Sequence, residues 1–170
     1  MSLKNVLKKN GLITPADLGL SEKLLGKAPF LLSKAAQKSR EAFEESLGPL
    51  GLTPKHYGVL TALEEKDSIS QHEIGRSICI DRTTMVQILD DLERLGYVER
   101  KEHPTDRRSH AVYLNAKGKE ALHKAHHLGA LVEKHILESL SAKEQKALLQ
   151  LLRRLVVALY SKNEKKGTTE

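Results

Sequence analysis

The strongest constraint in this 170-residue sequence is the stretch from Ile80 to Arg108, where a helical pattern, a glycine and a strand-turn-strand pattern follow one another. Asp81 is placed to accept a backbone N–H bond as an N-cap, and Gly96 stands where a left-handed cap ends a helix. Between them, apolar residues recur at spacings of three and four, namely Met85, Ile88, Leu89, Leu92 and Leu95. The stretch therefore predicts a helix with one side buried in a core and the other side free.

A small β-hairpin is predicted directly after this helix. Residues 97–100 and 111–114 have the composition of strands, and the polar run 103–106 between them has turn chemistry. Arg107 and Arg108 then lie at or beside an exposed loop. Exposed paired arginines suit phosphate or a narrow minor groove, and their alternative role is a solvated surface pair.

Two further helices are predicted upstream. Residues 70–73 match a capping box that opens a short helix, and the run 79–81 makes a tight turn into the helix that begins after Asp81. Thr53 and Pro54 supply an N-cap and an N1 proline for the helix before that. Two short helices joined by a tight turn make a helix-turn-helix, which the hairpin extends into a winged form.

The free side of the helix after Asp81 has the chemistry of base recognition. Arg82, Thr83, Val86 and Gln87 lie off the apolar stripe in the first two turns, where a recognition helix meets base edges in the major groove. Arginine bonds guanine, glutamine bonds adenine, and the valine or threonine methyl groups touch thymine. His72, at the first turn of the preceding helix, is either a phosphate contact or simply exposed. The pattern predicts double-stranded DNA as the partner.

Three segments resemble the MarR family of bacterial transcriptional regulators: residues 51–60, the run from Asp81 to Arg100, and residues 106–115, with similarity over about residues 28–160. The resemblance implies a homodimeric winged helix-turn-helix repressor or activator, often released from DNA by small phenolic or other aromatic acids, and sometimes by thiol oxidation or metals. It also implies base contacts by Thr84 and minor-groove contact by Arg108. Many members of the family carry a basic residue where Gln87 and Asp91 stand here.

Together, the sequence patterns and the family resemblance predict one DNA-binding surface. Its candidate residues are Ser70, Gln71, His72, Arg82, Thr83, Thr84, Val86, Gln87, Thr105, Asp106, Arg107 and Arg108. The net charge of +6 is not the basis for this surface, because residues 66–120 carry ten basic and ten acidic side chains. The placement of Arg100, Lys101, Arg107 and Arg108 together on the wing matters more.

The fold class expected is mainly α with a small β-hairpin wing, a winged helix-turn-helix plus a helical dimerisation region. Residues 1–27 are an N-terminal extension, 28–160 a MarR-like domain and 161–170 a disordered tail, with a winged core at 53–115 and dimerisation helices at 28–48 and 116–160. The capping box at 141–144 opens a helix that is apolar on more than one side, so a second subunit is expected to cover it.

Small-molecule and metal sites are weaker candidates. Ser33, Gln37, Arg40 and His56 are candidate contacts for an anionic or aromatic effector near the dimer base, with ordinary surface or packing roles as their alternative. The histidines at 123, 126 and 127 share a long helix, where they are either exposed or interface residues or part of a metal-responsive site. No cofactor and no resident metal are expected.

Cys79 is expected to be a small buried hydrophobic residue, with a thiol switch as the alternative. The sequence shows no activated nucleophile, general base pair or phosphate loop, so an enzyme is not expected. No secretory signal or spanning segment is apparent, which predicts a cytoplasmic protein. The alternative function is a winged-helix adapter for protein interactions.

Overall fold

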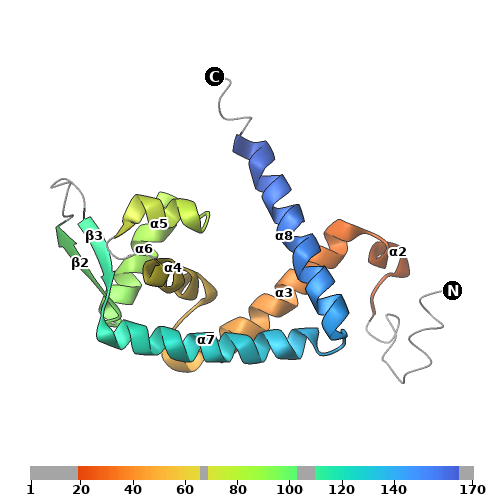
Figure 1. Cartoon of the computed structure of the whole chain (residues 1–170), viewed down its shortest axis with the longest axis horizontal. Coiled ribbons are helices and arrows are strands. Elements are labelled where there is room, and N and C mark those ends of the chain that lie inside the picture. The colour runs from red at the N-terminus through yellow and green to blue at the C-terminus, as the bar shows by residue number, and fades with distance from the viewer. Residues whose placement is uncertain (1–18, 66–68, 103–109, 165–170) are drawn as a thin grey trace.

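The computed structural model describes residues 19–65, 69–102 and 110–164, and Figure 1 shows a compact winged core at one end of a long helix, α7. The chain enters through α2 (Glu22–Leu25), α3 (Ala28–Leu47) and the 3-10 helix η1 (Gly48–Leu50). It leaves through α7 (Ala116–Leu137) and α8 (Ala142–Glu164). The predicted class, mainly α with a small wing, is confirmed.

The winged core lies between these outer helices. Its elements are α4 (Pro54–Glu65), β1 (Ile69–Ser70), α5 (Gln71–Ser77), α6 (Arg82–Arg94), β2 (Val98–Glu102) and β3 (His110–Leu114). The strands form one antiparallel sheet in the order β1-β3-β2, with Val98 opposite Leu114 and Ile69 opposite Val112. The hairpin was predicted, and the two-residue β1 was not, because so short a strand leaves no alternating pattern.

The core is built from the apolar sides of these elements. Met85, Leu89 and Leu92 of α6 are at most 1% exposed, so the predicted stripe is buried as expected. They pack with Leu60 of α4 and with Leu122 of α7, which closes the core from the side of the long helix. The winged core is thus completed within one chain.

Both ends of α6 are set by the residues that the sequence singled out. Asp81 accepts the Thr84 N–H at 3.0 Å, as the predicted N-cap. Gly96 has a φ of +73°, and the Tyr97 N–H donates to the Leu92 carbonyl at 2.9 Å, as in a Schellman motif. Recognition helix and wing are therefore joined by a sharp, fully hydrogen-bonded turn.

The turn between α5 and α6 differs from the prediction that Cys79 is buried. Cys79 is exposed and has a left-handed φ of +55°, while the Ile80 N–H donates to the Gly75 carbonyl at 2.9 Å. This is the same C-terminal cap as at Gly96, with cysteine in the glycine position. The prediction of a buried Cys79 was wrong, because its apolar neighbours Ile78 and Ile80 turn inward and leave the residue between them outside.

The start of α7 is fixed tightly against the winged core. Asn115 caps the helix by accepting the Gly118 N–H at 2.9 Å, and its side-chain amide donates to the Gly96 carbonyl at 3.0 Å. A Cβ atom on Gly118 would lie 2.1 Å from the Tyr97 carbonyl oxygen. Only glycine permits this approach, so the direction in which α7 leaves the core is determined here.

Helix α8 rises from the far end of α7, and its C-terminal end leans back toward the side on which the winged core lies (Figure 1). Its capping box is formed, because the Ser141 N–H donates to Glu144 at 2.8 Å. Among the described elements none packs extensively against α8, and Leu151 and Leu159 are 60% and 53% exposed. The helix continues through Glu164, so residues 161–164 belong to α8 and not to a disordered tail, and residues 165–170 lie outside the described residues. None of the helices in the described ranges has the length and apolarity needed to cross a membrane.

Candidate nucleic-acid interface

The first two turns of α6 present an accessible surface of mixed chemistry. Arg82, Thr83, Val86 and Gln87 are all exposed, on the side opposite the buried stripe. Guanidinium, hydroxyl, methyl and amide groups therefore lie together at the N-terminal end of one helix. That is the set of groups with which major-groove base edges are distinguished.

Thr84 differs from these four neighbours. It is half-buried, and its hydroxyl donates to the second carboxylate oxygen of Asp81 at 2.7 Å while its N–H donates to the first. These hydrogen bonds from Thr84 hold the pKa of Asp81 below its ordinary value, so the capping carboxylate stays charged in mildly acidic solution. In the free protein Thr84 thus supports the helix start, and direct base contact by it stays a prediction.

The acidic second half of α6 is largely paired within the molecule. Arg100 donates to Asp90 and to Glu93, at 2.6 Å in each case, and its side chain is 23% exposed. The prediction that Arg100 belongs to a free basic cluster on the wing was therefore wrong. Strand alternation gives the reason: Val98 and Arg100 share the inward side of β2, which faces α6. That alternation was visible in the sequence and places Arg100 on the side of Val98, but it does not say which residues of α6 lie opposite.

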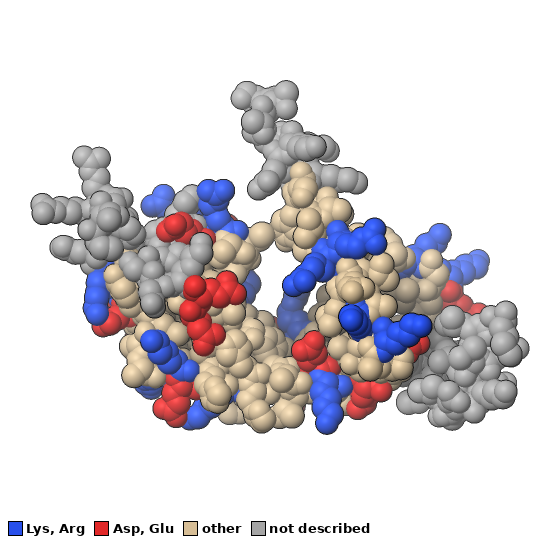
Figure 2. Space-filling model, viewed as in Figure 1, with Lys and Arg blue, Asp and Glu red and all other residues tan. Residues whose placement is uncertain are grey.

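Lys101 lies on the other side of β2 and is also engaged. Its ammonium pairs with Glu99 at 2.6 Å and lies 5.3 Å from the centre of the Tyr113 ring. On the face drawn in Figure 2, basic and acidic side chains are interspersed over the winged core, with no single basic patch.

Several predicted contacts lie outside the described residues. These are Thr105, Asp106, Arg107 and Arg108 at the wing tip, together with the side chains of Ser70, Gln71 and His72. The backbone of the last three is described: Ser70 ends β1, and α5 begins at Gln71. Their assignment as DNA contacts remains a prediction.

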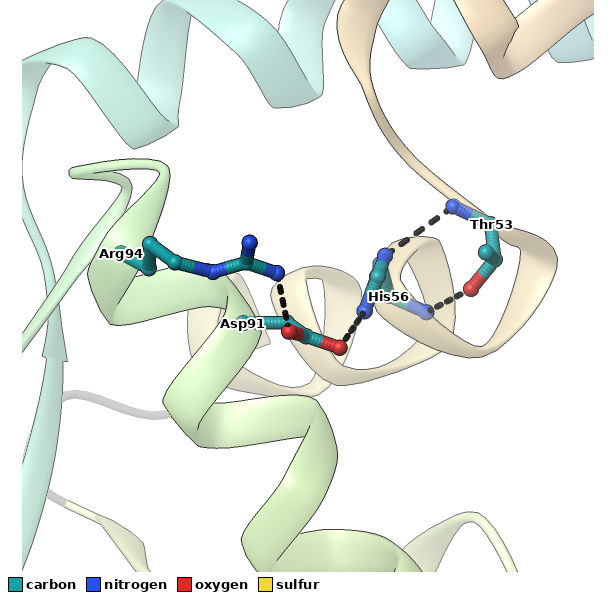
Figure 3. Close-up of polar contacts among 4 residues, drawn as sticks. All are labelled: Thr53, His56, Asp91 and Arg94. Atoms are coloured by element: carbon teal, nitrogen blue, oxygen red, sulfur yellow. Dashed lines mark hydrogen bonds and ion pairs between the residues drawn. The ribbon is translucent and has the colours of Figure 1, made fainter.

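His56 is not on the accessible surface where an effector contact was expected. The residue is 7% exposed, and its Nδ1 accepts the Thr53 N–H at 3.1 Å (Figure 3). Its Nε2 lies 3.7 Å from a carboxylate oxygen of Asp91 on α6. Burial lowers the pKa of His56, and the neighbouring Asp91 charge opposes this in part. The other candidates for an effector contact, Ser33, Gln37 and Arg40, are exposed on α3.

The histidines of α7 do not converge. The His126 ring is held by the Tyr57 hydroxyl at 2.9 Å and by Glu64 at 3.0 Å, both from α4, while His123 and His127 are exposed. Within residues 19–65, 69–102 and 110–164, no three His, Cys, Asp or Glu side chains come together in a way that could hold a metal ion. His126 instead links the winged core to α7.

Comparison with known proteins agrees with this geometry. Residues 50–109 match the model of the MarR family. The chain is 29% identical to the transcriptional regulator HosA of Escherichia coli O111:H- over 133 residues, 75% of this chain and 98% of that protein. It is 31% identical to the uncharacterised HTH-type transcriptional regulator YkoM of Bacillus subtilis strain 168 over 104 residues, 61% and 68% of the two chains.

A solved structure extends the likeness to DNA binding. The transcriptional repressor CouR, bound to a 23-mer DNA duplex, superposes with a TM-score of 0.75 at 32% identity. The superposition covers 79% of this chain and 96% of that one. Most of this chain thus shares its fold with a repressor whose structure was solved on DNA.

Proposed function

The chain belongs to the MarR family of DNA-binding transcriptional regulators, a family of regulators and not of enzymes, and we propose that it acts as a homodimer that recognises an operator sequence. One observation carries the proposal: Arg82, Thr83, Val86 and Gln87 are exposed on a capped helix whose other side is anchored in the core. In the dimer, two such helices would enter successive major grooves about 34–36 Å apart. The wing arginines Arg107 and Arg108 would contact the flanks.

The proposed dimer is supported by the outer helices. Exposed apolar side chains are concentrated on α8, with others on α3 and α7, and include Leu31, Leu131, Leu151, Val156, Leu159 and Tyr160. A concentration of exposed apolar side chains of this kind indicates a protein interface, and an isologous contact between two copies buries the same surface twice. The helices of the two subunits would therefore pack together and hold the winged cores at a fixed spacing.

A repressor is the form of regulation that we propose, because the superposed relative CouR is titled a repressor. We further propose that a small aromatic or anionic effector changes the spacing of the two recognition helices. Ser33, Gln37 and Arg40 follow one another at spacings of four and three on α3 and so share one exposed side, which makes them candidate effector contacts.

The test begins with selection of genomic fragments that bind the purified full chain, followed by affinity measurements on the selected duplex. Replacement of Gln87 by alanine should cost about 1–3 kcal/mol on that sequence and relax its base preference. Replacement of Arg108 by alanine should weaken binding to all sequences and lower the salt slope by about 1. Gln150→Ala, an exposed glutamine on α8, is the matched control. If Gln87→Ala and Arg108→Ala both bind like the wild type, the proposed interface is wrong.

A further inference from the structure

A histidine occupies an unusual place at the start of α4. In a capping box, the N-cap hydroxyl accepts the N–H of the third helical residue, whose side chain in turn accepts the N-cap N–H. Here the Thr53 hydroxyl oxygen accepts the His56 N–H at 3.3 Å, and the His56 Nδ1 accepts the Thr53 N–H at 3.1 Å (Figure 3). The imidazole thus does what a glutamate or glutamine side chain ordinarily does.

This arrangement fixes the protonation state of the ring. A backbone N–H only donates, so Nδ1 must be unprotonated to accept it. The single proton of the neutral ring is then on Nε2, which faces Asp91 of α6 at 3.7 Å. Protonation would place a second donor on Nδ1, directly opposite the Thr53 N–H. The capping box at His56 can therefore exist only while the ring is neutral.

The surroundings of the ring also favour the neutral form. His56 is 7% exposed, and burial disfavours the charged form of the ring. The peptide dipoles at the N-terminal end of α4 also disfavour a cation there. The elements packed against α4 are α3, α5, α6, α7 and β3, and among their described residues Asp91 is the charged group that acts on the ring. Arg94 pairs with the other carboxylate oxygen of Asp91 at 2.5 Å, which partly neutralises it.

We propose that the Thr53–His56 capping box, with Asp91 opposite it, is an acid-sensitive contact that positions the recognition helix, so that protonation of His56 weakens DNA binding. Protonation breaks the hydrogen bond from the Thr53 N–H to His56 at the start of α4 and draws the ring toward Asp91. Asp91 belongs to α6, the helix that carries the exposed residues Arg82 and Gln87. His56 and Asp91 are positioning residues here, since neither lies among the exposed first two turns of α6. The inference rests on the proposed DNA binding.

The direction of the pH dependence follows from the chemistry. Burial lowers the pKa of His56 below its ordinary value, and Asp91 opposes the shift. The stabilisation from the neutral ring is complete above the ordinary histidine range near pH 6.5 and is lost as the pH falls through the lowered pKa. A glutamine at position 56 would keep both the acceptor for Thr53 and a donor toward Asp91, with nothing to titrate.

The experiment follows the full-length protein and His56→Gln between about pH 7.5 and pH 5.5. Nitrogen-15 NMR of the imidazole gives the tautomer and the titration midpoint, and the amide resonances of Thr53 and of α6 report the coupling. Affinity is measured for a mixed-sequence duplex of about 30 base pairs, long enough for two half-sites one turn apart. His127→Gln, an exposed histidine on α7, is the control.

We expect the Nε2–H tautomer at neutral pH, and α6 amide shifts that follow the His56 midpoint. Relative to His56→Gln, the wild type should lose about fivefold or more in duplex affinity on acidification, and His127→Gln should behave like the wild type. Asp91→Asn should move the His56 midpoint to lower pH, which a purely structural role for Asp91 would not do.

Two outcomes would overturn the proposal: a ring already protonated at pH 7, or identical pH profiles of affinity for the wild type and His56→Gln. If no variant binds DNA at any pH, the proposed function fails, while the α6 amide shifts still decide whether His56 and the recognition helix are coupled. Circular dichroism at pH 7.5 checks that the three substituted proteins are folded.

Discussion

The winged core and the outer helices use similar apolar patterns with opposite results. Along α6, Leu89 and Leu92 are fully buried within one chain. Along α8, leucines at the same helical spacings remain open, with Leu151 at 60% and Leu159 at 53% exposure. The spacing of apolar residues therefore predicts that one side of a helix is covered. It does not predict whether the covering residues come from the same chain or from a second one. The winged core folds against itself, whereas α8 leaves its apolar side open to the second subunit that we propose.

The largest expected effect is on the outer helices. Glutamates at Leu155 and Leu159 would place two charges on the apolar side of α8, where a second subunit is proposed to pack. Because burying an unpaired charge is costly, the dimer dissociation constant should rise by about a thousandfold or more, with little change in helix content. Sedimentation equilibrium measures this. Arg154→Glu, on the polar side of α8, is the control, and a dimer that tolerates both glutamates would contradict the comparison.

Within the winged core, Leu92→Ala should cost about 2–5 kcal/mol of unfolding free energy, because the side chain is fully buried and leaves a cavity. Val86 provides a control on the same helix, since it is 38% exposed on the other side. Val86→Ala should change stability by no more than about 0.5 kcal/mol. Urea unfolding at one fixed protein concentration measures both. Equal losses for the two variants would mean that α6 is not anchored as described.

The junction between the two regions is tested by two glycines of α7. Gly118→Ala should cost about 1–3 kcal/mol, because the added methyl group would overlap the Tyr97 carbonyl. At Gly129 the nearest atom to an added Cβ is in the Phe43 ring at 3.4 Å, an ordinary contact. Gly129→Ala should therefore be neutral or gain up to about 1 kcal/mol of helix propensity. Thermal unfolding distinguishes the two, and a neutral Gly118→Ala would contradict the tight docking of α7.

The smallest expected effect concerns the hydrogen bond that joins α4 to α7. Tyr57→Phe removes the bond from the hydroxyl to His126 while leaving the ring against Phe43, and should cost about 1 kcal/mol. Gln150→Ala is the control, because Gln150 is exposed on α8 among its polar residues. Urea unfolding measures both variants. A Tyr57→Phe protein as stable as the wild type would mean that this bond adds nothing to the junction.

Helix ends were the most predictable part of the fold. Asp81 and the Ser141–Glu144 capping box were both assigned from sequence, and each forms the expected hydrogen bond. Capping joins residues two or three positions apart, so the sequence contains both partners. The same holds for the left-handed cap at Gly96.

The differences from the sequence analysis have other causes. Arg100 was assigned to a basic cluster on the wing, and Cys79 was expected in the core. In the structure Arg100 pairs with Asp90, ten positions earlier, and Cys79 is turned outward by a left-handed backbone. His56, a candidate effector contact with packing as its alternative, faces Asp91 of another helix. The contacts of Arg100 and His56 depend on how two elements cross, which local spacing does not specify, whereas the exposure of Cys79 depends on the backbone of a single turn.

The sequence alone determined the identity, order and ends of the helices that build the winged core, and the side of α6 that remains free, because these depend on periodicity and on contacts within one turn. The tertiary structure decided which polar side chains are paired within the molecule and which are free to contact another molecule. Packing of β2 and α4 against α6 paired Arg100 with Asp90 and Glu93 and brought His56 to Asp91, since burial leaves a charged or polar group stable only where another element supplies its partner.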